Sequence, residues 1–488
     1  MPGMAPAIVI AGAGECGTRA AFALREEGWD GPVILAGAEP SAPYERPPLS
    51  KTGELKPICD SGALREAGIS FLPGTEAAGL DTAAHVLELA DGRRLPYRSL
   101  LLATGARARR LPSGGAPVHV LRTRADSAAL RARLRPGRRV AVIGGGFIGL
   151  ELAGAAASLG CAVTVIELGP RLMGRAVPAR VAAVMAQRHI TAGVDIRCGT
   201  GVTGLAETAS GVAIALAEGG TVEADVVVAG VGAAPETSLA ETAGIETADG
   251  IVVDAHFATS APDVFAAGDC CRYPHPLYDD RPLRLESWRA AREHGAAAAR
   301  AILGGTEPYA GVPWFWSDQH DYTLQVAGLA DTAAAEVVRV RPDGVEVWFG
   351  LDGRGRLVAA AAAGPGNSVA RDIKLAEMLI ARRAAPEPAA LADPGVALKS
   401  VLRAPVASYE PASIPVREPE EGTCCDSACS APGGSAGSTP PRWPCTRGRS
   451  WPSCTTRSRS PRTRSPRSTA RSPPRMPTRS SATPLSTP

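Results

Sequence analysis

The chain has 488 residues, of which 45% are hydrophobic and 4% aromatic, and it carries a formal net charge of +3. This length suits roughly two to four domains with a sizeable core. The sequence has no run of about 18 uncharged apolar residues and no basic N-terminal region followed by an apolar stretch, so we expect neither a membrane-spanning helix nor a secretory signal. We therefore expect a cytoplasmic protein with no membrane partner.

The C-terminal end differs from the rest of the chain in charge. Residues 423–488 contain 11 Arg, no Lys and a single acidic residue, Asp426, whereas residues 1–422 contain 41 basic and 48 acidic residues. Contacts with phosphates dominate the affinity of a protein for nucleic acid. The acidic body therefore argues against nucleic-acid binding, and such a function would rest on the tail alone.

A strand–turn–helix pattern begins the chain. Residues 7–11 are apolar, as expected of a buried parallel strand, and a helix-forming run ends at Gly28. Between them, Gly12, Gly14 and Gly17 make a G-x-G-x-x-G turn. The first glycine permits a tight bend, the second lets backbone amides approach a pyrophosphate, and the third lets the helix pack closely on the strand. The pattern predicts a dinucleotide-binding site.

The same pattern returns further along the chain. A strand from Arg139 leads into a turn with Gly144, Gly146 and Gly149, and a helix-like run and another strand follow. Glu167 ends that second strand, 18 residues after Gly149. A carboxylate at this position can bind the hydroxyls of an adenosine ribose and would repel a 2′-phosphate, so Glu167 favours NADH over NADPH.

Two local features qualify these ribose contacts. Arg171 and Arg175 follow Glu167 and could soften its discrimination against a 2′-phosphate. In the first unit the matching strand end is Gly37, and Glu39, two residues later, is the candidate ligand of the adenosine ribose. The alternative for Glu39 is an ordinary loop carboxylate.

Two dinucleotide turns in one chain indicate two dinucleotide cofactors. We expect one turn to hold FAD and the other NADH, so that a hydride can pass between them. The flavin would then release electrons singly to a one-electron acceptor, or pass both to a disulfide or to oxygen. No metal site is expected.

The remaining pattern defines the expected domains. Short strands follow the second turn, a helix is predicted near residues 285–303, and from Val312 short strands and a further helix continue to about residue 405. We expect an α/β fold with two Rossmann-like domains, a C-terminal α+β domain and a disordered tail. The expected boundaries are 1–115 and 245–311 for the FAD-binding domain, 116–244 for the NAD-binding domain, 312–405 for the C-terminal reductase domain, and 406–488 for a linker and tail.

Seven segments strengthen this interpretation because they occur in a fixed order. They are residues 12–17, 43–51, 100–106, 144–153, 264–270, 286–291 and 313–319. Together they resemble the FAD-dependent ferredoxin reductases that serve Rieske oxygenases and bacterial cytochromes P450. The resemblance covers about residues 5–405. It implies a flavoprotein that passes electrons from NADH through FAD to a [2Fe–2S] ferredoxin.

The resemblance also implies roles for individual residues. The backbone at Gly12, Gly14 and Cys16 would hold the FAD pyrophosphate. Lys51 would lie near the flavin N5, and Glu151 would approach the nicotinamide carboxamide. No residue is expected to act as an acid or a nucleophile.

Further cofactor contacts follow from the same resemblance. Ala77 would hold the adenine through its backbone, and Arg122 would reach the flavin phosphates. Asp269 would accept a hydrogen bond from the ribityl chain, while Trp288 and Trp316 would pack around the flavin ring. The remaining expected cofactor-binding residues are Arg46, Thr104, Gly105, Phe147, Ile148, Gly232 and Gly268.

Two other functions stay open at this point. A disulfide reductase or an NADH oxidase or peroxidase on the same fold would need a redox cysteine beside the flavin. Residues 36–51 contain no Cys, and Cys59 is later and isolated. An apoptosis-inducing-factor-like flavoprotein that binds DNA is the third class.

The partner surface and the tail are the least defined features. An acidic ferredoxin would need a basic patch near the flavin edge, for which Arg289, Arg292 and Arg300 are candidates, with 131–139 as another. The tail, 423–488, is too rich in Pro, Ser, Thr and Arg to fold alone. It resembles either an RNA-associated Arg-Ser tract or the product of a shifted reading frame. The oligomeric state is left open.

Overall fold

The structure is a computed structural model, and it describes residues 7–403. The first sheet contains, in spatial order, β3 (Ile69–Leu72), β2 (Val33–Ala36), β1 (Ala7–Ala11), β6 (Arg94–Leu102), β5 (Val86–Leu89) and β4 (Ala77–Asp81), with β19 (Val264–Ala266) also paired to β6. Every residue of β1 is buried between its parallel neighbours β2 and β6. The uninterrupted apolar run at the start of the chain therefore forms the central strand that it predicts.

A second sheet, in which every pairing is parallel, contains the strand that leads into the second glycine turn. It contains β11 (Asp195–Cys198), β10 (Ala162–Glu167), β9 (Arg139–Ile143), β15 (Val226–Ala229) and β8 (Val118–His119). Both Rossmann-like units thus place a glycine turn directly after a central strand, and both place a helix directly after the turn. These helices are α1 (Glu15–Glu26) and α4 (Phe147–Ser158).

The C-terminal residues form an antiparallel sheet with helices. Its strand order is β22 (Trp314–Gln319), β23 (Tyr322–Gly328), β26 (Leu357–Pro365), β25 (Glu346–Leu351) and β24 (Ala335–Val340). The alanines of β26 alternate between two cores. Ala360 and Ala362 face the core that α8 (Ala370–Ala381) covers, while Ala359, Ala361 and Ala363 join the core that contains α4 and α5 (Ala179–Thr191). The α/β fold with a C-terminal α+β domain is therefore confirmed.

Smaller elements connect these sheets. The additional strands are β7 (Ala106–Ala108), β12 (Val202–Thr208), β13 (Gly211–Leu216), β14 (Thr221–Ala224), β16 (Ala233–Pro235), β17 (Thr247–Ala248), β18 (Gly250–Val252), β20 (Cys271–His275) and β21 (Arg281–Leu283). The additional helices are α2 (Ser61–Glu66), α3 (Arg124–Arg131), α6 (Ser238–Thr242), α7 (Trp288–Ile302), α9 (Pro388–Ala392) and α10 (Leu398–Val401), with short 3₁₀ turns η1 (Pro47–Leu49), η2 (Gly268–Cys270), η3 (Pro276–Tyr278) and η4 (Ala330–Thr332). No helix within residues 7–403 is long and apolar enough to cross a membrane. The expected tail lies outside the described residues, and the domain boundaries stay predictions.

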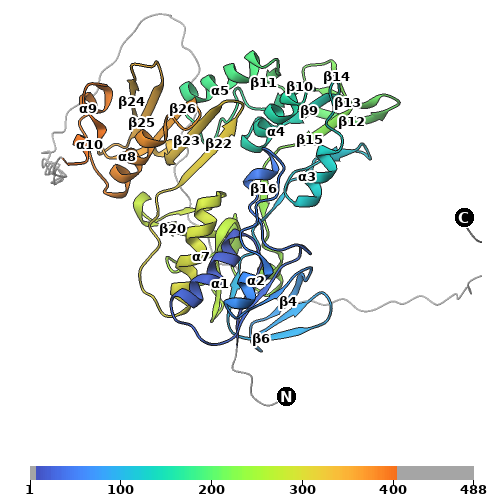
Figure 1. Cartoon of the computed structure of the whole chain (residues 1–488), viewed down its shortest axis with the longest axis vertical. Coiled ribbons are helices and arrows are strands. Elements are labelled where there is room, and N and C mark those ends of the chain that lie inside the picture. Colours follow the sequence, from blue (N-terminus) through green and yellow to red (C-terminus); the bar gives the residue numbers. More distant parts are fainter. Residues whose placement is uncertain (1–6, 404–488) are drawn as a thin grey trace, which may run out of the picture. The chain divides into compact units, whose positions relative to one another are not determined.

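Helices α1 and α7 lie side by side, although about 260 residues separate them in the chain (Figure 1). Gly295 of α7 allows this approach, because a Cβ there would overlap the carbonyl oxygen of Cys16 in α1. The contact joins the helix that follows the first glycine turn to the helix that begins at Trp288. It therefore fixes Trp288 relative to the first turn.

We expect Gly295→Ala to lower the free energy of unfolding by about 1–3 kcal/mol, because the added methyl group meets backbone that cannot move aside. Gly154→Ala in α4 is the matched control. A Cβ at Gly154 would lie 3.5 Å from its nearest neighbour, an ordinary contact, so the usual gain of about 0.5–1 kcal/mol for Gly to Ala in a helix should remain. Thermal unfolding followed by circular dichroism measures both. Equal stability of the two variants would contradict the close approach.

Candidate functional site

The first glycine turn is tightly packed on its inner side and open on its outer side. Gly12 has a φ of +117°, and a Cβ there would overlap the carbonyl oxygen of Ala103. A Cβ at Gly17 would overlap the carbonyl oxygen of Gly12 itself. Gly14 is the N-cap of α1, and a Cβ there would meet nothing within 4 Å. The unpaired amides at the start of α1 therefore face open space, which suits an anionic diphosphate.

The second turn repeats this geometry. Gly144 has a φ of +108°, and a Cβ there would overlap the carbonyl oxygen of Gly230. A Cβ at Gly149 would overlap the carbonyl oxygen of Gly144, whereas a Cβ at Gly146, the N-cap of α4, would meet nothing within 4 Å. Both turns therefore offer the same kind of open helix N-terminus to a diphosphate.

The carboxylate of Glu167 is held by the second turn. Its two oxygens accept hydrogen bonds from the backbone amides of Gly145 and Gly169, each at 2.6 Å. The carboxylate is thus fixed beside the turn, at the end of β10. The guanidinium of Arg171 donates to the carbonyl oxygens of Val177 at 2.9 Å and Gly174 at 3.0 Å, so that cation is occupied by backbone.

Glu39 is engaged by side chains of its own domain. Tyr44 donates its hydroxyl to one oxygen at 2.5 Å, and Arg46 donates to the other at 3.1 Å. Burial and the hydrogen bond to Glu39 raise the pKa of Tyr44 to about 12, which keeps that hydroxyl a donor. Arg46 also donates to the carbonyl oxygen of Arg122. The ribose contact expected of Glu39 stays a prediction.

Charged and small residues surround the first turn. Arg122 donates to Asp269 at 2.9 Å, and Gly105 lies against the guanidinium of Arg122. Gly268 has a φ of +82° and faces the side chain of Cys16, which is buried. The structure therefore brings together residues from three distant parts of the chain that the sequence interpretation assigns to one cofactor.

Three other expected cofactor residues make contacts away from the glycine turns. Thr104 donates its hydroxyl to the carbonyl oxygen of Glu236 at 2.6 Å. Gly232 accepts a backbone hydrogen bond from Arg109, and Ala77 begins the edge strand β4.

The two side chains at the start of α4 differ in their surroundings. Phe147 packs against Phe315 with ring centroids 4.7 Å apart. Ile148 is 46% exposed, so its side chain is free to meet a ligand at the mouth of the second turn.

Side chains from the two Rossmann-like units meet in a charged pair. Lys51, from the first unit, lies 3.9 Å from Glu151, which is on the helix that follows the second turn. Lys51 also binds Asp318 of β22 at 2.5 Å. Ser50 and Ser317 both donate hydroxyl hydrogen bonds to the buried carboxylate of Glu151. Burial raises the pKa of Glu151, while the nearby ammonium of Lys51 and the two hydroxyls act in the opposite direction.

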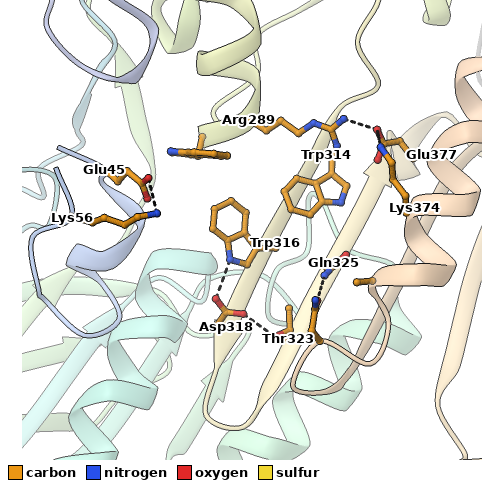
Figure 2. Close-up of a pocket in the computed structure, with 13 residues that line it drawn as sticks. Glu45, Lys56, Arg289, Trp314, Trp316, Asp318, Thr323, Gln325, Lys374 and Glu377 are labelled. Carbon is orange, nitrogen blue, oxygen red and sulfur yellow. Dashed lines mark hydrogen bonds and ion pairs between the residues drawn. The ribbon is translucent and has the colours of Figure 1, made fainter. Parts of the chain in front are cut away.

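Aromatic side chains border this pair. The ammonium of Lys51 lies 4.8 Å from the ring centroid of Trp316. Trp316 stacks on Trp314 at 5.5 Å and meets Trp288 edge-on at 5.9 Å. The three tryptophans line a pocket of about 580 Å³ whose wall also contains Glu45, Lys56, Arg289, Asp318, Thr323, Gln325, Asn367, Ala370, Lys374 and Glu377 (Figure 2).

Comparison with known proteins identifies this arrangement. Two family descriptions match the chain: pyridine nucleotide-disulphide oxidoreductase over residues 6–295 and reductase C-terminal over residues 314–402. The ferredoxin–NAD(+) reductase component of the anthranilate 1,2-dioxygenase system from Burkholderia cepacia is 44% identical, over 81% of this chain and 98% of that protein. The chain belongs to the ferredoxin reductases of the pyridine nucleotide-disulphide oxidoreductase family. The resemblance found in the sequence is thereby confirmed.

Other members of this family agree with the assignment. Putidaredoxin reductase from Pseudomonas putida is 35% identical, over 81% of this chain and 97% of that protein. The crystal structure of a covalent putidaredoxin reductase–putidaredoxin complex superimposes with a TM-score of 0.77 and 33% identity, over 82% of this chain and 99% of that chain. As a ferredoxin reductase, the chain is an oxidoreductase that uses a flavin and a pyridine nucleotide.

The residues around the first turn fit FAD. The open front of Gly14 accommodates a diphosphate, and Arg122, which pairs with Asp269, lies against Gly105. The Nε atom of Arg122 is buried and has no hydrogen-bond partner within residues 7–403, so it is free to bind an anionic oxygen. A bound flavin dinucleotide would use the open amides of α1 for its diphosphate and Arg122 as a further donor.

Several residues of the ferredoxin reductase site were missed by sequence reasoning. Ser50, Ser317 and Asp318 surround the Lys51–Glu151 pair, yet no role was expected for them. All three lie inside two of the seven segments, 43–51 and 313–319, so the signal was present. Their roles become visible only when β22 is placed beside α4.

The cysteines of this ferredoxin reductase separate it from the disulfide reductases. Among the described residues all cysteines are free. Burial raises the pKa of the Cys16 and Cys271 thiols well above the ordinary value and also raises that of Cys270. Burial raises the pKa of Cys59 to about 11. A redox cysteine requires a thiolate, and these groups are held protonated.

We expect Cys16, Cys270 and Cys271 to resist iodoacetamide at pH 8 in the folded holoenzyme and to react fully in denaturant. Their thiols are buried, and too little thiolate forms for alkylation. Peptide mass mapping identifies the modified residues. Rapid modification of Cys16 together with loss of turnover would instead favour a disulfide reductase.

Proposed function

We propose that this protein passes electrons from NADH through FAD to a [2Fe–2S] ferredoxin that supplies a Rieske oxygenase or a cytochrome P450. One observation carries the proposal. Lys51 from the FAD-binding unit and Glu151 from the NAD-binding unit meet at 3.9 Å, so two dinucleotides bound at the two turns would direct their reactive rings to one place. Hydride transfer requires such an approach between the two rings.

The protein's contribution is binding and orientation. The open amides at Gly14 and Gly146 hold the two diphosphates, and Glu167 holds the NADH ribose. Lys51 places a cation beside the flavin ring, and Glu151 accepts a hydrogen bond from the nicotinamide carboxamide. Bound FAD supplies the hydride acceptor and divides the electron pair between two one-electron acceptors.

The pocket beside the tryptophans is the proposed docking place of the ferredoxin. Lys56 and Lys374 stand at its wall, where they pair with Glu45 at 2.9 Å and with Glu377 at 3.1 Å. Their side chains are still 67% and 60% exposed, so an acidic partner can reach them. Arg289, a docking candidate from the sequence, is less available, since Glu377 at 2.5 Å and Glu293 at 2.8 Å neutralise it. Arg292 remains 53% exposed and lies over Trp288.

The experiment that tests this function uses purified holoenzyme and NADH. The rate of cytochrome c reduction is measured with and without an added [2Fe–2S] ferredoxin. A flavin absorption spectrum with strong stimulation by ferredoxin supports the proposal. A flavin spectrum with no dependence on ferredoxin but fast oxygen or peroxide turnover would transfer the assignment to an oxidase or peroxidase.

The preference for NADH rests on Glu167. We expect Glu167→Gln to reduce the ratio of kcat/KM for NADH to that for NADPH by about tenfold, because the variant loses the charge that repels a 2′-phosphate. Steady-state kinetics with both nucleotides measures the ratio. Glu218→Gln, which removes an equal charge from the exposed β13–β14 turn, is the control. An unchanged ratio in Glu167→Gln would contradict the assigned ribose contact.

A further inference from the structure

A continuous chain of hydrogen bonds leads away from Glu151 into the protein. Ser317 donates to Glu151 at 2.7 Å, and Gln319 donates its amide to Ser317 at 2.9 Å. The other end of the Gln319 amide meets His189 Nε2 at 2.9 Å, and His189 Nδ1 meets His320 Nε2 at 3.1 Å. The chain crosses from α4 through β22 to α5 and ends at the turn after β22.

The donors and acceptors of each residue give this hydrogen-bond chain a single direction, in which every donor faces Glu151. An ionised Glu151 can only accept hydrogen bonds, so the single hydroxyl proton of Ser317 is donated to Glu151. The Ser317 oxygen must then accept a hydrogen bond from Gln319. Gln319 therefore presents its NH₂ group to Ser317 and its carbonyl oxygen to His189. That oxygen requires a proton on His189 Nε2, and a neutral imidazole then has Nδ1 free to accept from His320 Nε2.

The central members of the chain are shielded from solvent. Ser317 and His189 are fully buried and Gln319 is 1% exposed, whereas His320 is only partly buried. Burial lowers the pKa of His189 to about 4, so its ring is neutral at physiological pH, as the direction of the chain requires. Burial and the neighbouring Arg188 also lower the pKa of His320, while Asp321 acts in the opposite direction.

We propose that Ser317, Gln319, His189 and His320 form a polarised positioning relay that keeps Glu151 ionised and aimed beside Lys51. The inference rests on the proposed function, since that function places Glu151 at the nicotinamide. Every donor in the relay points toward the carboxylate, so the four dipoles add. A carboxylate that accepts charge-assisted hydrogen bonds retains its charge at a lower pH than burial alone would permit.

Charged groups outside the relay act at its two ends. At the Glu151 end these are Lys51 and Asp318, and the latter raises the pKa of Glu151. At the His320 end they are Arg188 and Asp321, which pair with each other. The middle of the relay is therefore oriented by hydrogen bonds alone. Removal of one hydrogen bond should change the orientation or the tautomer of the residues beyond it.

The first test is independent of turnover. The chain contains seven His residues, so the full-length holoenzyme labelled with ¹⁵N-histidine gives few side-chain signals. Long-range ¹H–¹⁵N correlation spectra should show His189 and His320 as neutral rings, each with its proton on Nε2. A proton on Nδ1 of His189 would overturn the proposed direction.

The second test breaks one link. In Ser317→Ala the Gln319 amide loses its acceptor and can turn, so His189 should become a mixture of its two neutral tautomers. The acid limb of the rate of flavin reduction by NADH, measured by stopped flow, should move up by about one pH unit, because Glu151 loses one charge-assisted hydrogen bond. Ser317→Thr retains the hydroxyl and should restore both properties.

Ser158→Ala is the matched control, because it removes a hydroxyl from α4 that donates to the Gly154 carbonyl and takes no part in the relay. It should leave the tautomer and the pH profile unchanged. If folded Ser317→Ala also leaves both unchanged, the relay is merely structural and the proposal is wrong. If NADH does not reduce the flavin of the wild-type protein but His189 has the expected tautomer, the proposed function is wrong. The direction of the hydrogen-bond chain is then still correct.

Discussion

Gly14→Val should yield a folded protein that contains no bound flavin. Gly14 has a φ of −80° and a ψ of −168°, which a β-branched residue adopts without strain, and a Cβ there meets nothing within 4 Å. The fold should therefore lose about 1 kcal/mol or less, as for a poorer N-cap. The isopropyl group would, however, occupy the space in front of the α1 amides. The flavin content measured from absorbance should fall at least about tenfold.

Gly146→Val provides the reciprocal case at the same position of the second turn. Its φ of −83° and ψ of −179° are equally permissive. This variant should keep its flavin and lose affinity for the nicotinamide nucleotide. The Kd for NAD⁺, measured by titration of the oxidised holoenzyme, should rise at least about tenfold. Loss of flavin from Gly146→Val, or full flavin content in Gly14→Val, would contradict the assignment of FAD to the first turn.

Lys51→Met should impair both stability and flavin reduction. The change leaves the buried Glu151 and the half-buried Asp318 without their shared cation. We expect the free energy of unfolding to fall by about 2 kcal/mol at pH 8, because an uncompensated carboxylate remains inside the protein. The rate of flavin reduction by NADH should fall at least about tenfold. Stopped-flow absorbance measures the rate, and thermal unfolding measures the stability.

The stability defect of Lys51→Met should depend on pH. Burial already raises the folded-state pKa of Glu151, and loss of Lys51 raises it further. A group with a raised folded-state pKa is destabilising above that pKa and loses this effect as it takes up a proton at lower pH. The difference in melting temperature between wild type and variant should therefore shrink from pH 8 toward pH 5. A difference that grows toward acid pH would contradict this account.

Lys51→Arg is the control that retains the positive charge. Its stability should lie close to that of the wild type, although the longer planar group changes the geometry beside Trp316. Equal defects in Lys51→Met and Lys51→Arg would show that shape, and not charge, governs this position.

The local features of the fold were predictable because they depend on short-range physics. The run at residues 7–11 and the glycines after it determine a strand and a tight turn within about ten residues. Gly12 and Gly14 show this, since one is confined by Ala103 and the other faces open space, as the spacing predicts. The second turn and the position of Glu167 follow from the same reasoning.

The centre of the site was predictable only through resemblance. Lys51 and Asp318 form an ion pair, although 267 residues separate them in the sequence. The hydrophobic periodicity of a sequence does not predict a contact between residues so far apart. Ser50 and Ser317 are common residue types whose hydroxyls acquire a role only beside a buried carboxylate. The neutral state of His189 likewise arises from burial in the assembled protein, which a sequence does not display.

The strand β22 has one further consequence. Its even-numbered residues Trp314, Trp316 and Asp318 line the pocket, while its odd-numbered residues face the other way, with Ser317 on Glu151 and Gln319 on His189. Side chains alternate between the two faces of a strand. Substitutions of Trp314 therefore leave Ser317 and Gln319 in place, and Asp318 is the residue that couples the pocket face to Lys51. A register slip of one residue would exchange the two faces and displace both sets of side chains at once.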